Sequence, residues 1–181
     1  MNSAYEIKQI FEPTNEILEG LVKLTKSTVE HGASIGFLNE TSHEKYVDLW
    51  NSTFKKVADN ETVLLIAKHM ATDLTVGTVQ LHIDLPENQT HRTELAKMMV
   101  HADHRRNGIA VALLDAIEKI AKVNKKSLIV LDTATDSNAQ KLYQKCGWIV
   151  AGSIPDYAFS PDGVLTRTTY MYKILEIEKN I

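Results

Sequence analysis

A short basic loop between two apolar segments is the part of this sequence best suited to bind an anion. The loop runs from His101 to Asn107 and contains Arg105 and Arg106, and a helical pattern starts directly afterwards at Gly108. The first turn of a helix carries unpaired N–H groups and a partial positive charge, so it binds phosphate oxygens. Cations at this end of a helix are unfavourable unless an anion joins them. The pattern therefore favours a phosphate site.

Two common phosphate-binding motifs are missing from the sequence, which restricts the kind of anion that the loop could bind. The patterns G-x-x-x-x-G-K-[ST] and G-x-G-x-x-G are both absent, which argues against ordinary nucleoside triphosphate and dinucleotide sites. The alternative is a loop without a ligand, in which the arginines are solvated and Gly108 only lets a helix pack tightly on a sheet. A phosphate site would therefore bind a phosphate-bearing molecule other than these nucleotides, whereas a solvated loop would bind no ligand.

Composition restricts the class of protein. The chain has 181 residues, 44% of them hydrophobic, and we expect one domain over residues 1–181. The net charge of -3 argues against a nucleic-acid binder, and no stretch is long and apolar enough to cross a membrane. Cys146 is the only cysteine, which excludes a disulfide framework and a thiolate metal cage. The expected compartment is the reducing cytoplasm.

Hydrophobic periodicity predicts a mixed α/β fold. Apolar runs predict strands at 4–11, 62–67, 74–83, 93–100, 127–131, 148–154 and 168–175. Amphipathic runs predict helices at 14–29, 42–57, 108–123 and 137–147. The continuous run 127–131 is typical of a strand covered on both faces, and 155–167 is predicted to be a loop. Consecutive hairpins in the middle distinguish this order from a doubly wound sheet.

Two short motifs give the chain a family resemblance. The run RRNGIA (105–110) matches the signature [QR]-x-x-G-x-[GA] of the GCN5-related N-acetyltransferases, and an apolar strand precedes it. Downstream, NAQKLYQKCGW (138–148) resembles the second block of that family, which places Asn, Tyr and Gly-[FW] in this order. The resemblance implies a mostly antiparallel sheet of about seven strands with helices on both faces. It also implies acetyl-CoA as cosubstrate, with no metal.

A closer likeness suggests the acceptor. The runs GASIGF (32–37), LDTAT (131–135) and PDYAFSPDG (155–163) are similar to segments of tabtoxin-resistance acetyltransferases, which detoxify a small amine-bearing compound. The resemblance implies a small-molecule amine as partner and allows a homodimer. Ala102 and Ala110 depart from the proline and glycine that the family often has there. Neither change removes a backbone N–H, so we expect the cofactor still to bind.

The resemblance also assigns residues to the cofactor. The strand ending at Val100 would pair with the amides of the pantetheine arm as an added strand does, and the loop after it would hold the pyrophosphate. Asn138 would bond the arm through its side chain. The complete predicted cofactor site consists of Met98, Met99, Val100, Arg105, Arg106, Asn107, Gly108, Ile109, Ala110, Val111 and Asn138.

Amide formation also requires groups that handle protons. An alkylammonium has a pKa near 10, so a carboxylate must take a proton before the amine attacks. By resemblance, Glu94 and Asp132 form this pair; Glu94 would share a strand face with Ala96, Met98 and Val100, and Asp132 would end its strand. The alternatives are a solvated carboxylate for Glu94 and a turn residue for Asp132. Which of the two acts as the base stays open.

Tyr143 is the predicted acid that protonates the departing thiolate. A phenol with a pKa near 10 is protonated at neutral pH and able to donate. An aromatic residue beside Ala139 and Leu142 on a helix is otherwise typical of a core. Its place in the second family block is what favours the catalytic role.

The remaining motifs receive other interpretations. Residues 32–36 fit G-x-S-x-G, but a helical run precedes them, so a nucleophile elbow is disfavoured. We expect this loop to cover the acceptor, with Ser34 and Phe37 lining the site. His101 and His104 lack carboxylate or thiolate partners in sequence, which argues against zinc.

Three functional readings remain open from the sequence. The chain acetylates a small amine, acetylates a peptide or protein amine, or binds acyl-CoA without turnover as a sensor. The loop at 155–167 would roof a closed pocket in the first case and form one wall of an open groove in the second. The joint presence of Glu94, Asp132 and Tyr143 favours catalysis.

Overall fold

The computed structural model describes residues 4–177 and contains one seven-stranded sheet, in the order β1-β2-β3-β4-β5-β7-β6. The strands are β1 (Tyr5–Ile10), β2 (Thr62–His69), β3 (Thr75–His82), β4 (Arg92–Val100), β5 (Leu128–Ala134), β6 (Ile149–Phe159) and β7 (Leu165–Ile174). The helices are α1 (Asn15–Glu30), α2 (His43–Ala58), α3 (Ile109–Val123) and α4 (Asn138–Lys145), with 3-10 turns at Glu87–Gln89 and Ala102–His104. The predicted fold class and element order are confirmed. No helix in residues 4–177 has the length and apolarity to cross a membrane.

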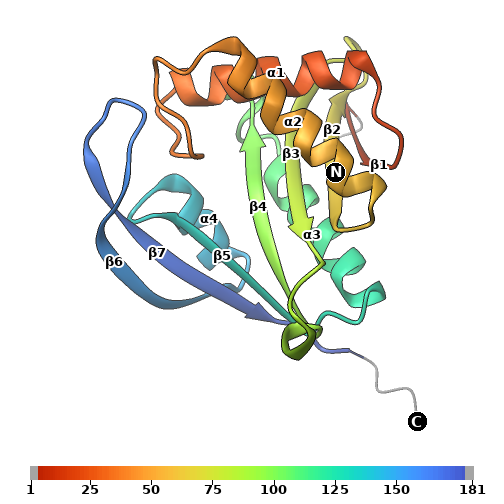
Figure 1. Cartoon of the computed structure of the whole chain (residues 1–181), viewed down its shortest axis with the longest axis vertical. Coiled ribbons are helices and arrows are strands. Elements are labelled where there is room, and N and C mark those ends of the chain that lie inside the picture. Colours follow the sequence, from red (N-terminus) through yellow and green to blue (C-terminus); the bar gives the residue numbers. More distant parts are fainter. Residues whose placement is uncertain (1–3, 178–181) are drawn as a thin grey trace.

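Helices cover both faces of the first four strands (Figure 1). Because successive strand residues point to opposite faces, Leu64 and Ile66 of β2 pack under α1 and α2, whereas Leu65 packs in the cluster that includes α3. Trp50 of α2 is fully buried, and its indole N–H donates to Thr25 Oγ1 of α1 at 2.9 Å. These two layers hold β4 in a fixed position.

Within residues 4–177, strands β4 and β5 are the only parallel neighbours, and they pair over a short length. Their register pairs are Arg92 with Leu128, Thr93 with Ile129, and Glu94 with Val130. Beyond Glu94 the two strands diverge, as Figure 1 shows above the point where they meet. The remaining length of β4 therefore has ladder partners on its β3 side and none on its β5 side.

A β-bulge in β4 corrects the predicted strand face. Lys97 has a positive φ of 49°, and the β3–β4 register shifts at this point. Ala96 lies on the α2 face because it pairs with Gln80, whose amide donates to Thr53 of α2. After the bulge, Met98 packs in the α3 cluster on the opposite face. Glu94 therefore does not share a face with Met98 and Val100, because the extra residue reverses the alternation.

The last hairpin is longer than predicted. Strands β6 and β7 extend through most of the segment 155–167, and only residues 160–164 form the turn. Pro155 lies inside β6 because β6 is an edge strand, where a missing N–H breaks no ladder bond. The prediction of a long loop was wrong, since exposed edge strands lack the hydrophobic alternation that identifies strands.

The prediction that the strand at 127–131 is covered on both faces was also wrong. Ile129 and Leu131 are buried against α3 and α4, but Val130 is only half-buried on the other face. The face of the sheet opposite α4 is therefore open over β5, β7 and β6. Strand β5 also continues to Ala134, so Asp132 lies within the strand and not at its end.

Candidate active site

The first turn of α3 presents free backbone donors. Gly108 caps the helix with a φ of 79°, a conformation that side chains other than glycine rarely adopt. The first bond of the helix runs from Ala112 N–H to Gly108 O at 3.0 Å, so the N–H groups of the three residues between them have no acceptor within the helix. The Ile109 side chain is buried beside Gly77, and only its backbone is available to a ligand.

The loop before α3 is fixed by its own side chains. Asn107 Nδ2 donates to the carbonyls of His104 and Arg105, at 3.2 and 3.3 Å. Arg105 Nε donates to Val100 O at 3.3 Å and so joins the loop to the end of β4. Arg106 is exposed and has a φ of 63°. The loop, the helix start and the Arg105 side chain thus belong to one local structure.

Strand β4 offers backbone groups to a cofactor. The Met99 side chain is buried in the cluster under α1 and α2, and the Met98 and Val100 side chains pack against the α3 cluster. Their N–H and C=O groups on the β5 side lie beyond the last β4–β5 pair. An extended amide chain would bond to such a row as an added strand does.

Helix α4 places Asn138 and Tyr143 across the gap from β4. Ser137 caps α4 by accepting from Gln140 N at 3.1 Å, and Gln140 Oε1 accepts from Asp136 N at 2.6 Å. This arrangement is close to a capping box, with the return bond displaced by one residue. Asn138 is exposed in the first turn and takes no part in the cap.

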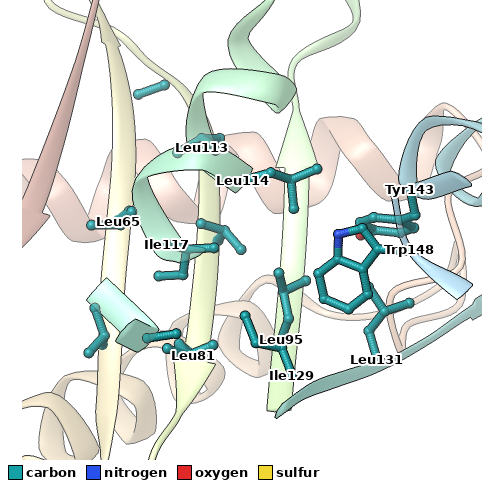
Figure 2. Packing of buried hydrophobic residues seen from close by; sticks show 14 of the residues in the cluster. Leu65, Leu81, Leu95, Leu113, Leu114, Ile117, Ile129, Leu131, Tyr143 and Trp148 are labelled. Carbon is teal, nitrogen blue, oxygen red and sulfur yellow. The ribbon is translucent and has the colours of Figure 1, made fainter. Parts of the chain in front are cut away.

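The Tyr143 ring lies in the core. It is 4% exposed and lies 5.6 Å from the Trp148 ring, as Figure 2 shows. Burial raises the pKa of the Tyr143 phenol well above its usual value, with smaller contributions from Asp132 and Cys146. The side chain is therefore both a core residue and a phenol that keeps its proton.

The two predicted carboxylates lie on the open face. Glu94 pairs with Val130 across the last β4–β5 contact, and its Oε1 accepts from Arg92 at 2.9 Å. Asp132 is two residues further along β5 on the same face as Val130. Solvent reaches Asp132, but the surrounding protein still raises the pKa of its carboxyl by burial; Lys97 opposes this effect and Glu94 adds to it. Asp132 is therefore a better proton acceptor than an ordinary aspartate.

The loop between α1 and α2 lies over this face. Phe37 packs edge-on against Tyr46 with ring centroids 4.9 Å apart, and Ser34 is half-buried. Asn39 N–H donates to Pro161 O in the β6–β7 turn at 2.8 Å. The G-x-S-x-G run follows a helix and not a strand, so it does not form a nucleophile elbow.

Lys97 is the residue that sequence reasoning missed. Its Nζ donates to Ile35 O at 2.8 Å and lies 5.9 Å from the centre of the Phe37 ring. Burial lowers the pKa of Lys97, and the charge of Asp132 partly offsets this effect. No periodicity marks such a residue, because its position depends on the bulge.

An apolar hollow continues the open face away from Asp132. Its volume is about 570 Å³, and its lining includes Val130, Tyr170 and Tyr172. Tyr170 pairs with Asp132 across the β5–β7 ladder and donates to the Tyr157 hydroxyl at 2.6 Å. The carboxylate thus borders a region suited to apolar groups.

Comparisons with known proteins agree with this architecture. Human N-acetyltransferase 8 is 37% identical over 79 residues, which are 42% of this chain and 35% of that protein, so the chain spans about a third of this curated relative. The ribosomal-protein-S5-alanine acetyltransferase of Vibrio fischeri has a TM-score of 0.80 at 12% identity, covering 99% of this chain and 97% of that chain. The yncA protein of Salmonella typhimurium, solved with its cofactor acetyl-CoA, has a TM-score of 0.75 at 15% identity, covering 99% and 98%.

The two solved structures share the fold of this chain at identities that carry no more than the fold. The sequence model of the acetyltransferase (GNAT) family is more informative, because it matches residues 28–148 and so includes β4, the loop, α3 and α4. The chain belongs to the GNAT family of acetyltransferases.

Proposed function

We propose that this chain transfers the acetyl group of acetyl-CoA directly to a primary amine of a small molecule. The observation that carries the proposal is the gap that opens between β4 and β5 after Glu94. Free N–H groups of α3 lie at one end of it, and the carboxylates of Glu94 and Asp132 lie on its open face. This placement would bring a bound thioester and an amine together.

The cofactor residues fit the parts of coenzyme A. The N–H groups at positions 109–111, with Arg105 and Arg106, suit the pyrophosphate, and the β5-side backbone of β4 suits the amides of the arm. Asn138 is exposed in the first turn of α4 across the gap. Acetyl-CoA would supply an activated acyl carbon and a thiolate leaving group.

The protein's own groups would move the protons. A carboxylate, Asp132 or Glu94, takes a proton from the ammonium directly or through one water, and the neutral nitrogen attacks the thioester carbon. The C–S bond breaks as the C–N bond forms. The Tyr143 hydroxyl donates its proton to the thiolate sulfur and recovers one as the site exchanges with solvent. The carboxylate passes its first proton to solvent before the attack, and it then takes the excess proton that remains on the nitrogen, so the amide is released neutral.

The closure of the acceptor side favours a small molecule over a peptide. The bond from Asn39 N–H to Pro161 O joins the α1–α2 loop to the turn of the β6–β7 hairpin. A peptide groove requires both ends open, whereas this contact blocks one end. We therefore keep the tabtoxin-resistance-type likeness as our proposal for the kind of acceptor, with protein acetylation as the alternative.

Two further expectations complete the proposal. We propose that residues 1–181 act as one acetyltransferase domain. A homodimer is supported by β6, an edge strand of 11 residues with Ile149, Ile154 and Phe159 exposed. The sheet order leaves its outer side without a partner strand.

The decisive experiment measures thiol release from acetyl-CoA across a panel of amines, amino acids, aminoglycosides and peptides. We expect turnover with small amines and little with peptides longer than a few residues. Calorimetric titration with coenzyme A tests the cofactor site separately. Binding without turnover on any acceptor would favour the sensor alternative, and preferred turnover of peptides would favour protein acetylation.

A further inference from the structure

One half-buried ammonium near the proposed site has no role in the mechanism above. Lys97 projects from the bulge of β4 toward the α1–α2 loop, where Nζ bonds Ile35 O at 2.8 Å. An ammonium has three N–H donors, and this bond uses one of them. Among residues 4–177, no carboxylate oxygen lies within the 4.0 Å of Lys97 Nζ that defines an ion pair.

A buried charge without a counter-ion is unfavourable unless something else pairs with it. An apolar side chain in place of Lys97 would avoid this cost, because Phe37 and Gly36 already lie beside Nζ. A Cβ on Gly36 would lie 3.5 Å from Nζ. Lys126 shows what a purely structural buried lysine looks like in this chain. Its Nζ bonds two carbonyls, those of Ile83 and Thr90, at the paired end of β4 and β5 and not at the end where the gap opens.

The charges on the open face are arranged by sign. Glu94 lies on β4 at the last β4–β5 pair, and Asp132 lies opposite on β5. Lys97 follows Glu94 by three residues, which with one bulged residue is about 7 Å along the strand. A ligand with an amine at one end and an anion at the other would place its amine by Glu94 and Asp132 and its anion by Lys97.

We propose that Lys97 binds a carboxylate of the acceptor, so that the substrate is an amino acid or a similar zwitterionic amine. This inference rests on the proposed function and specifies its substrate class. The amine end lies by Asp132 and Glu94, and the carboxylate accepts the two N–H donors of Lys97 that Ile35 leaves free. Charge-assisted bonds of this kind are stronger than neutral ones.

The test uses pairs of acceptors that differ only in the carboxylate. The pair set contains three amino acids (β-alanine, γ-aminobutyrate and L-lysine) and the dipeptide glycylglycine, and each acid is compared with its amide, on wild type and on Lys97→Met. We expect wild type to prefer the acid at least tenfold in kcat/KM. In Lys97→Met this preference disappears through a higher KM for the acid, while the amide keeps its kcat.

Lys126→Met is the matched control. It also removes a buried ammonium that bonds backbone carbonyls, so it tests the effect of lost stability alone. We expect a lower Tm and an unchanged preference for the acid. If Lys97 only supported the α1–α2 loop, Lys97→Met would weaken acids and amides equally, which would overturn the proposal.

Calorimetry separates this proposal from the proposed function. Each acid and amide is titrated into the wild-type protein saturated with coenzyme A, so that no turnover is needed. Tighter binding of the acid, lost in Lys97→Met, supports the carboxylate site even if no thiol is released. Equal binding of acid and amide, or no binding of either, overturns it whatever the thiol-release assay shows.

Discussion

The backbone N–H of Asn39 donates to the carbonyl of Pro161 at 2.8 Å, joining two segments that are more than a hundred residues apart. Pro161 is buried, and the turn that holds it is fixed by Ser160, whose hydroxyl donates to Asp162 and accepts from Val164 N–H. A turn fixed by its own hydrogen bonds thus meets the loop between α1 and α2. In the proposed function, this contact would limit the access of large acceptors.

Removing this donor should weaken acceptor binding. Asn39→Pro deletes the N–H, and a net hydrogen bond is worth about 0.5–1.5 kcal/mol, so we expect the acceptor KM to rise about 2- to 10-fold. The dissociation constant for coenzyme A should not change. Asn39→Ala keeps the N–H and serves as the control; an equal rise in KM for both variants would show that the bond does not matter.

Tyr143→Phe should separate the chemical role of the phenol from its packing. Phenylalanine keeps the ring against Trp148, so we expect only a small change in Tm, but kcat should fall about 10²- to 10³-fold. Calorimetry should give unaltered affinity for coenzyme A. Tyr46→Phe removes another buried phenol and should retain turnover. Normal kcat in Tyr143→Phe would remove Tyr143 from the mechanism.

Gly108→Val should weaken cofactor binding. A side chain at a φ of 79° costs about 1–2 kcal/mol, and relieving this strain would turn the first N–H groups of α3 away from the phosphates. We expect the dissociation constant for coenzyme A to rise at least tenfold. Gly32 has the same φ and also has open space at its Cβ position, so Gly32→Val is the control. Unchanged affinity in Gly108→Val would contradict the pyrophosphate assignment.

Asp132→Asn should lower the activity without lowering the stability of the fold. Because the pKa of Asp132 is raised in the folded state, chiefly by burial, the ionised form destabilises the fold. The stability that protonation provides is present at low pH and is lost as the pH rises through the carboxyl range. At pH 7 we therefore expect the variant to have an equal or higher Tm and a kcat/KM about 100-fold lower.

The pH profile checks the same group. A general base must be ionised, so the acidic limb of kcat/KM in wild type should lie above the usual aspartate range. Glu94→Gln is the comparison, since it removes the ion pair with Arg92 and has no reason to raise Tm. If Asp132→Asn lowered Tm and left kcat/KM intact, Asp132 would have a structural role alone.

Strong periodicity made most of the fold readable from the sequence. The apolar stripes of α1 and α3 and the run TVLLIA in β2 indicate their elements directly, because each buries a regular face. Strand β6 was half missed because nearly all its side chains are exposed and Pro155 interrupts it. Such a strand is held by its ladder to β7, which the local sequence does not encode.

The candidate site shows the same division. The motif at the start of α3 was recognisable because backbone donors at a helix start need small residues and a glycine with positive φ. Lys97 was not, because its direction depends on a bulge that only the pairing of β3 with β4 creates. Tyr143 lies in the core, as its position beside Ala139 and Leu142 indicates, and its role as proton donor is part of our proposal.

The short seam between β4 and β5 has a mechanical consequence. Three register pairs join the half of the sheet that carries α1 and α2 to the half that ends in the β6–β7 hairpin. Beyond this seam, the two halves are joined by the packing of α3 in a shared core, by the ion pair of Lys173 with Glu118 and by the Asn39–Pro161 hydrogen bond. Because few backbone bonds cross between the halves, amide protons of β5, β6 and β7 should exchange together and faster than those of β2 and β3. A chain-like molecule bonded along the seam would lengthen it and slow that exchange.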